Sequence, residues 1–125
     1  MTLRILPQRL AICRLAAGAE IPSWTRSSAW LSITRTPSEL SIVCDSAIVP
    51  DGVLQEAPWR AFEVQGPLDF SLTGVLAALA GILAQAEISL FAISTYDTDY
   101  ILVRKANVAD ATTVLREAGH TVEPA

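Results

Sequence analysis

The chain has 125 residues, of which 51% are hydrophobic and 18% are charged. A chain this apolar can bury enough surface to fold, as one compact unit or as two very small ones, so its composition excludes an intrinsically disordered protein. The 13 acidic and 9 basic residues give a formal net charge of -4. Because no basic cluster exceeds the pair Arg104-Lys105, we do not expect nucleic-acid binding.

Two cysteines, Cys13 and Cys44, and the single histidine, His120, lie far apart in the sequence. They form no Cys-x-x-Cys or mixed Cys/His set, so we expect no zinc site and reduced thiols in the cytosol. A proline and an arginine interrupt residues 1–9, which therefore lack the apolar core of a secretory signal. The uncharged run 70–86 is short for a membrane span and contains glycines and polar residues. A cytoplasmic protein without a membrane anchor is expected.

The first half of the chain alternates short strand patterns with turn signals. The turn at 36–39 separates two strand patterns that read as an antiparallel hairpin or as close neighbours in a sheet. The expected elements are strands at 9–14, 29–34 and 40–44, a turn at 16–20, a short helical turn at 22–24, and an irregular segment at 45–58.

The second half is more regular, because apolar residues recur at helical spacing in two places. Asn107 and Gly119 are typical residues before the start and after the end of the second helix. The expected elements are strands at 59–65, 88–95, 100–104 and 120–122, and helices at 71–86 and 108–118. Their order predicts an α+β, ferredoxin-like βαββαβ fold, in which two helices cover one face of four antiparallel strands.

Two stretches of the second half carry a resemblance to a known family. They read Gly66-Pro67-Leu68-Asp69-Phe70-Ser71-Leu72-Thr73-Gly74-Val75-Leu76 and Phe91-Ala92-Ile93-Ser94-Thr95-Tyr96-Asp97-Thr98-Asp99-Tyr100-Ile101-Leu102-Val103. The chain over 59–122 resembles the ACT domain. It looks most like small bacterial proteins with two ACT-like modules that are related to CASTOR-type arginine sensors and, more distantly, to the regulatory domains of aspartate kinases.

The resemblance implies a ferredoxin-like fold, binding of a free amino acid or a similar small effector, and pairing of ACT modules within or between chains. It also implies two modules packed together. Residues 1–57 are expected to form a degenerate N-terminal ACT-like module with a short or missing first helix, and residues 58–125 the C-terminal ACT domain. The segment 66–70 departs from the Asp-x-Pro-Gly turn of many ACT domains.

The ligand region of the family maps onto the first helix start of the second half and onto the end of the following strand with its turn. A helix start offers unpaired backbone N–H groups to a ligand carboxylate, and carboxylates such as Asp69, Asp97 and Asp99 attract an ammonium group. Capping of the helix explains Asp69 and Ser71 equally well, and ordinary turn formation is the favoured explanation of Asp97 and Asp99. The implied ligand-binding residues are Asp69, Phe70, Ser71, Leu72, Thr73, Gly74, Ile93, Ser94, Thr95 and Asp97.

Motifs for catalysis are absent from the sequence, which has no Gly-x-Ser-x-Gly elbow, no phosphate loop and no metal-ligand set. We therefore expect no enzyme, no catalytic residue, no metal and no cofactor. The leading hypothesis is a non-enzymatic regulatory protein that binds a free amino acid at a module interface, formed within the chain or across a homodimer. The alternative is an ACT-fold interaction module that binds a protein partner, with its pocket filled by Phe70, Tyr96 or Tyr100.

Overall fold

The computed structural model describes residues 1–69 and 73–125, which form two compact units. The N-terminal unit comprises Gln8–Trp59, and the C-terminal unit comprises Arg60–Ala125 together with Met1–Pro7. The strand β5 (Leu54–Val64) contributes its first part to one unit and its last part to the other. The predicted division, 1–57 and 58–125, differs from these units in placing the first residues of the chain with the N-terminal module.

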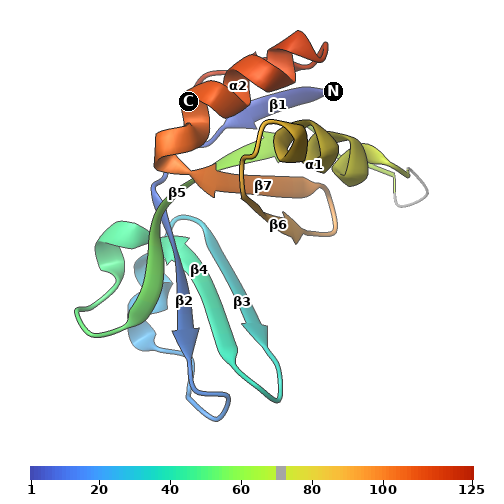
Figure 1. The fold of residues 1–125 in the computed structure, drawn as a ribbon. Coiled ribbons are helices and arrows are strands. Elements are labelled where there is room, and N and C mark those ends of the chain that lie inside the picture. The colour runs from blue at the N-terminus through green and yellow to red at the C-terminus, as the bar shows by residue number, and fades with distance from the viewer. Residues whose placement is uncertain (70–72) are drawn as a thin grey trace. The chain divides into compact units, whose positions relative to one another are not determined.

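The N-terminal unit is an antiparallel sheet with two short 3-10 helices, Ser23–Ser27 and Ser46–Ile48 (Figure 1). The predicted hairpin is confirmed as the pairing of β3 with β4. The core contains both cysteines and is covered by side chains of the 3-10 helices, Trp24 and Ile48. The strand order is β3 (Leu31–Arg35), β4 (Leu40–Asp45), β2 (Leu10–Leu15) and the first part of β5.

Strand β5 begins at Leu54, within the segment predicted to be irregular. The prediction was wrong here because Pro58 reads as a strand breaker. In the structure Leu10 pairs with Trp59 and Ile12 pairs with Glu56, so two residues of β5 oppose one residue of β2. This register shift is a β-bulge, where proline is tolerated because the ladder is already interrupted.

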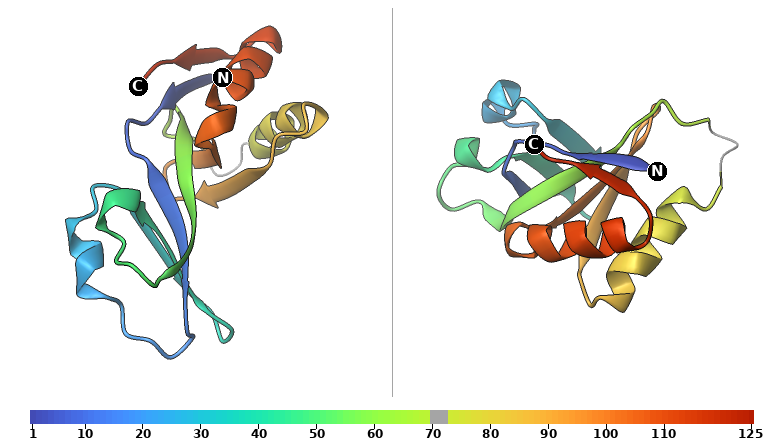
Figure 2. Two further views of the ribbon diagram at one scale, coloured as in Figure 1. Left: turned by 60° about the vertical axis from the view of Figure 1, so that its left-hand side comes forward. Right: turned by 90° about the horizontal axis from the view of Figure 1, so that it is seen from above.

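The C-terminal unit packs two helices against one face of a sheet (Figures 1 and 2). Its core combines residues of both helices, Leu79, Leu83 and Leu115, with sheet residues such as Phe62. The predicted α+β, ferredoxin-like fold is confirmed. The strand order is β8 (Thr121–Glu123), β1 (Thr2–Ile5), the last part of β5, β7 (Asp99–Arg104) and β6 (Leu90–Ser94), with the helices α1 (Val75–Gln85) and α2 (Val108–Glu117).

Strand β1 makes this sheet five-stranded instead of the predicted four. It lies between β5 and β8, antiparallel to the first and parallel to the second. Leu3 points into the core and is fully buried, whereas the neighbouring Arg4 is exposed. The sequence prediction missed β1 because four residues before a proline give a weak strand signal, and the partners of β1 are far along the chain.

The helix boundaries depend on two glycines with positive φ. Gly74, with φ 82, precedes α1, so this helix starts at Val75 and not at Ser71, which lies outside the described residues. Gly119, with φ 96, follows α2 as its predicted stop. Asn107 occupies the N-cap position of α2 but makes no side-chain cap hydrogen bond. In the described ranges, neither helix is long and apolar enough to cross a membrane.

Candidate functional site

A hollow of about 320 Å³ lies in the C-terminal unit, where three segments meet. The segments are the stretch after β5, the first turn of α1, and the turn between β6 and β7. The described residues that line the hollow are Leu68, Asp69, Gly74, Val75, Leu76, Ala77, Ser94, Thr95, Tyr96, Asp97, Thr98 and Asp99.

The turn between β6 and β7 is closed by a main-chain hydrogen bond and by its own polar side chains. The Thr95 N–H donates a hydrogen bond of 2.8 Å to the Thr98 carbonyl. The Ser94 hydroxyl donates to Asp99 Oδ1 at 2.6 Å, across the last residue pair of the two strands. Ser94, Thr95 and Asp99 thus stabilise the turn, as expected if these residues only form the turn. Their side chains also lie at the edge of the hollow.

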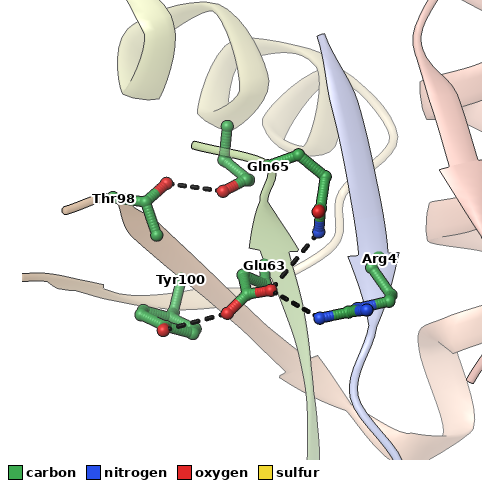
Figure 3. A network of polar contacts seen from close by, with 6 residues as sticks. Arg4, Glu63, Gln65, Thr98 and Tyr100 are labelled. Carbon is green, nitrogen blue, oxygen red and sulfur yellow. Dashed lines mark hydrogen bonds and ion pairs between the residues drawn. The ribbon is translucent and has the colours of Figure 1, made fainter. Parts of the chain in front are cut away.

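Two hydrogen bonds connect this turn to the end of β5 and the stretch after it. The Leu68 N–H donates to the Asp97 carbonyl at 2.7 Å. The Thr98 hydroxyl donates to the Val64 carbonyl at 2.6 Å, as Figure 3 shows. The two walls of the hollow are thus joined by one main-chain and one side-chain bond.

The hollow presents two opposite kinds of charge. Asp69, Asp97 and Asp99 contribute carboxylates, and none of the described lining residues is basic. The first turn of α1 contributes backbone N–H groups, because the first intrahelical bond at this end is that from the Ala78 N–H to the Gly74 carbonyl. A helix N-terminus carries a partial positive charge that attracts anions. The arrangement can therefore hold a molecule with both an ammonium and a carboxylate group.

The structure brings five of the predicted ligand residues around the hollow, namely Asp69, Gly74, Ser94, Thr95 and Asp97. Thr73 and Ile93 are not among its lining residues, and the predictions for Phe70, Ser71 and Leu72 lie outside the described residues.

Sequence reasoning missed the contribution of Leu68, of the first turn of α1 and of Thr98. The helix residues were missed because α1 was expected to start four residues earlier. The signal that would have found them is Gly74, whose freedom to adopt positive φ makes it a natural point at which to begin a helix. No local sequence signal indicates Thr98, because its hydroxyl bonds to the carbonyl of a residue more than thirty positions away.

Tyr96 and Tyr100 were expected to fill the pocket in the alternative hypothesis. Tyr96 lines the hollow but is 81% exposed, so most of its side chain faces solvent. Tyr100 is not a lining residue, and its hydroxyl donates to Glu63 Oε2 at 3.0 Å (Figure 3). Glu63 Oε1 also accepts from Arg4 and Gln65, both at 3.3 Å. This network links β1, β5 and β7 and leaves Tyr100 with a structural role.

The two cysteines are buried, free thiols in the N-terminal unit. The hydrogen bond between the two thiols, together with burial, raises the pKa of the Cys44 thiol well above its ordinary range. The same bond lowers the pKa of the Cys13 thiol, where burial acts in the opposite direction. Cys44 therefore stays protonated, and a protonated thiol is a poor nucleophile and a poor metal ligand. In the part of the chain that the structure describes, no group of three or more His, Cys, Asp or Glu side chains can hold a metal ion.

Comparison with known proteins assigns the family. The family model of the ACT domain matches residues 54–117, which include every described residue of the hollow. The chain belongs to the ACT domain family. A second family model, described as an N-terminal domain, matches residues 8–52 of this ACT-domain protein. The two matched ranges correspond to the main parts of the C-terminal and N-terminal units.

One group of curated relatives is similar to part of this ACT-domain protein. The cytosolic arginine sensor for mTORC1 subunit 1 of Homo sapiens and that of Bos taurus are each 39% identical to it over 59 residues. The match covers 46% of this chain but 18% of the sensors, so the chain spans less than a fifth of their length.

Solved structures are similar over nearly the whole chain. The Agobacterium tumefaciens protein Atu0741 superposes with a TM-score of 0.93 at 36% identity, covering 99% of this chain and 92% of that one. A Vibrio cholerae protein has a TM-score of 0.76 at 23% identity, covering 93% and 88% of the two chains. An aspartokinase structure has a TM-score of 0.63 at 14% identity, covering 94% and 97%. The last two likenesses concern the fold alone.

Proposed function

We propose that this ACT-domain protein is a non-enzymatic cytosolic sensor that binds a free amino acid in the hollow of its C-terminal unit. The observation that carries the proposal is the meeting of carboxylates and a helix N-terminus in one cavity. Each of the twenty amino acids carries its ammonium and its carboxylate group on the same carbon atom. Asp97 and its neighbouring carboxylates suit the first group, and the N–H groups of the first turn of α1 suit the second.

The size of the hollow supports a small ligand. Its volume of about 320 Å³ is at the lower end of the range of about 300–1,000 Å³ that is typical of small-molecule pockets. Apolar side chains of Leu68, Val75 and Leu76 lie beside the polar groups and can contact a side chain of the ligand. Such a mixture of apolar wall and few polar groups is typical of specific small-molecule sites.

The relatives support regulation instead of catalysis. The curated relatives, which match part of this chain, are named arginine sensors. For this chain we infer a regulatory role in which an amino acid is the effector. The effector acts by binding more tightly to one state of the protein than to another, which shifts the population toward that state.

The state that responds is, in this proposal, the association with a second copy. Among the described strands, β6 pairs with β7 alone, so its outer edge has unpaired backbone groups. Its sequence Leu90–Ser94 contains neither a charge nor a proline, the usual protection of an exposed edge. Helix α1 exposes the small residues Ala77, Ala78 and Gly81. Ser94 ends β6 at the hollow, so a copy paired with this edge lies next to the ligand.

A thermal-shift screen against the twenty amino acids at millimolar concentration tests the sensor. A ligand at 100 times its Kd adds about 2.7 kcal/mol to the free energy of unfolding, which raises the Tm by several degrees. We expect a selective shift that Asp97→Asn reduces strongly. Asp51→Asn, a matched change at an exposed turn of the N-terminal unit, leaves the shift unchanged. A screen without any shift contradicts the proposal.

The interaction module without a ligand is the second candidate, and the uncharged edge of β6 is the observation that favours it. In that case no amino acid raises the Tm, while Gly81→Leu on the exposed face of α1 weakens an association measured by analytical ultracentrifugation. An unchanged oligomeric state in Gly81→Leu argues against this surface.

A further inference from the structure

One residue near the hollow combines burial with a polar contact that a turn does not need. Thr98 is 7% exposed, whereas its neighbours in the turn, Tyr96 and Asp97, are exposed. A buried hydroxyl is costly unless it is hydrogen-bonded, and Thr98 satisfies its hydroxyl with the Val64 carbonyl at 2.6 Å. The turn itself is already closed by the bonds between Thr95 and Thr98. The bond to Val64 therefore serves the contact between the turn and β5.

The bond from Thr98 to Val64 lies at the end of the sheet, where it holds the turn against β5. Val64 is the last residue of β5, and Asp99 is the first residue of β7, the strand with which β5 pairs. The side chain of Thr98 thus continues the contact between the two strands one residue beyond the sheet. The chain after Val64 and the turn before Asp99 are two of the three segments that line the hollow, and they are the two walls that the Thr98 bond joins.

A second observation at the same place comes from Gly66. A Cβ atom at this position would lie 3.0 Å from the Leu68 nitrogen, 3.1 Å from the Asp97 carbonyl oxygen and 3.3 Å from the Thr98 Cβ. No side chain fits without moving one of these groups. Gly66 does not have the positive φ that also favours glycine, so the requirement here is space. The stretch after β5 and the turn approach closely because position 66 lacks a side chain.

From these contacts we infer that Thr98 is a positioning residue, which with Gly66 fixes the spacing of the two walls of the hollow and thereby places the Asp97 and Asp99 carboxylates. The effect of Thr98 on ligand binding rests on the proposed function, whereas its effect on the spacing of the walls does not. If the Thr98 bond is lost, the turn separates from β5, the bond from the Leu68 N–H to the Asp97 carbonyl opens more often, and the carboxylates lose their fixed position.

The test follows the two effects separately in the full chain. Amide hydrogen exchange of Leu68, measured by NMR without any ligand, reports on the walls. The Kd, measured by calorimetry with whichever of the twenty amino acids shifts the wild-type Tm, reports on binding. Loss of one buried hydrogen bond accounts for a change of about tenfold. We expect Thr98→Val to accelerate Leu68 exchange and to weaken binding by about this factor, and Thr98→Ser to restore both.

Thr25 provides the matched control. It is the other buried threonine in the described residues, 2% exposed, and its hydroxyl donates to the Pro22 carbonyl at 2.7 Å in the N-terminal unit. Thr25→Val removes the same kind of bond and lowers stability, but we expect it to leave Leu68 exchange and the Kd unchanged. Gly66→Ala, which keeps the threonine, is expected to accelerate Leu68 exchange as Thr98→Val does.

The outcomes separate the two proposals. Unchanged Leu68 exchange in Thr98→Val, or equal acceleration in Thr25→Val, overturns the role of Thr98. Faster exchange with an unaltered Kd overturns its effect on the carboxylates. If no amino acid binds the wild-type protein, the sensor function fails, and Leu68 exchange alone decides whether Thr98 holds the walls.

Discussion

Replacing Leu3 by alanine tests the most unexpected feature of the fold, the insertion of β1 between β5 and β8. Leu3 is fully buried, pairs with Val64 and Val122 in the two neighbouring strands, and belongs to the core under the helices. Truncation of a buried leucine costs about 2–5 kcal/mol, because it removes apolar contacts and leaves a cavity. We expect Leu3→Ala to lower the free energy of unfolding by this amount.

Arg4 is the matched control, since it is the next residue of the same strand and faces the opposite side of the sheet. Its side chain is 51% exposed and forms an ion pair with Glu63 at 3.3 Å. Exposed ion pairs contribute at most about 1 kcal/mol, so Arg4→Ala has a small effect. Urea unfolding followed by far-UV circular dichroism measures both variants. Equal losses in Leu3→Ala and Arg4→Ala, or a loss below about 1 kcal/mol in Leu3→Ala, would refute the placement of β1.

Three further changes test local features by the same unfolding assay. Gly119→Ala lowers the free energy of unfolding by about 1–2 kcal/mol, because φ at this position is 96. Gly81→Ala, in the exposed part of α1, raises the free energy of unfolding by up to about 1 kcal/mol. Equal effects of the two changes would contradict the assigned end of α2. Asn107→Ala changes stability by less than about 0.5 kcal/mol, because Asn107 makes no cap bond; a larger loss would contradict this geometry.

The fold of the C-terminal unit could be predicted because local patterns and global topology agree there. The apolar spacing of α1 and α2, the stop at Gly119 and the turn between β6 and β7 are all encoded within a few residues of where they act. Local agreement of this kind is what makes a sequence specify one structure. The place of β1 in the sheet, which extends the βαββαβ pattern, is not encoded by neighbouring residues in this way.

The features that were missed depend on partners far along the chain. Strand β1 is stabilised by β5 and β8, not by its own propensity. The early start of β5 depends on the bulge opposite β2, which accommodates Pro58. The role of Thr98 depends on the Val64 carbonyl. Such non-local contacts override local propensity, so a reading of neighbouring residues cannot find them.

Only part of the candidate site could be predicted from the sequence. Asp69, Gly74 and the residues at the end of β6 were found through a resemblance to a family, and the structure places them around one hollow. The groups of α1 that complete the hollow follow from where the helix starts, which depends on the conformation of Gly74. The sequence alone placed that start four residues too early.

The central claim, that the hollow binds a free amino acid, is tested most directly by NMR titration of the labelled protein with the twenty amino acids. The account predicts that one or a few of them shift the amide resonances of the first turn of α1 and of residues 94–99. The amides of the N-terminal strands β3 and β4 should stay unchanged. Shifts confined to other parts of the chain, or no shifts with any amino acid at millimolar concentration, would contradict the claim.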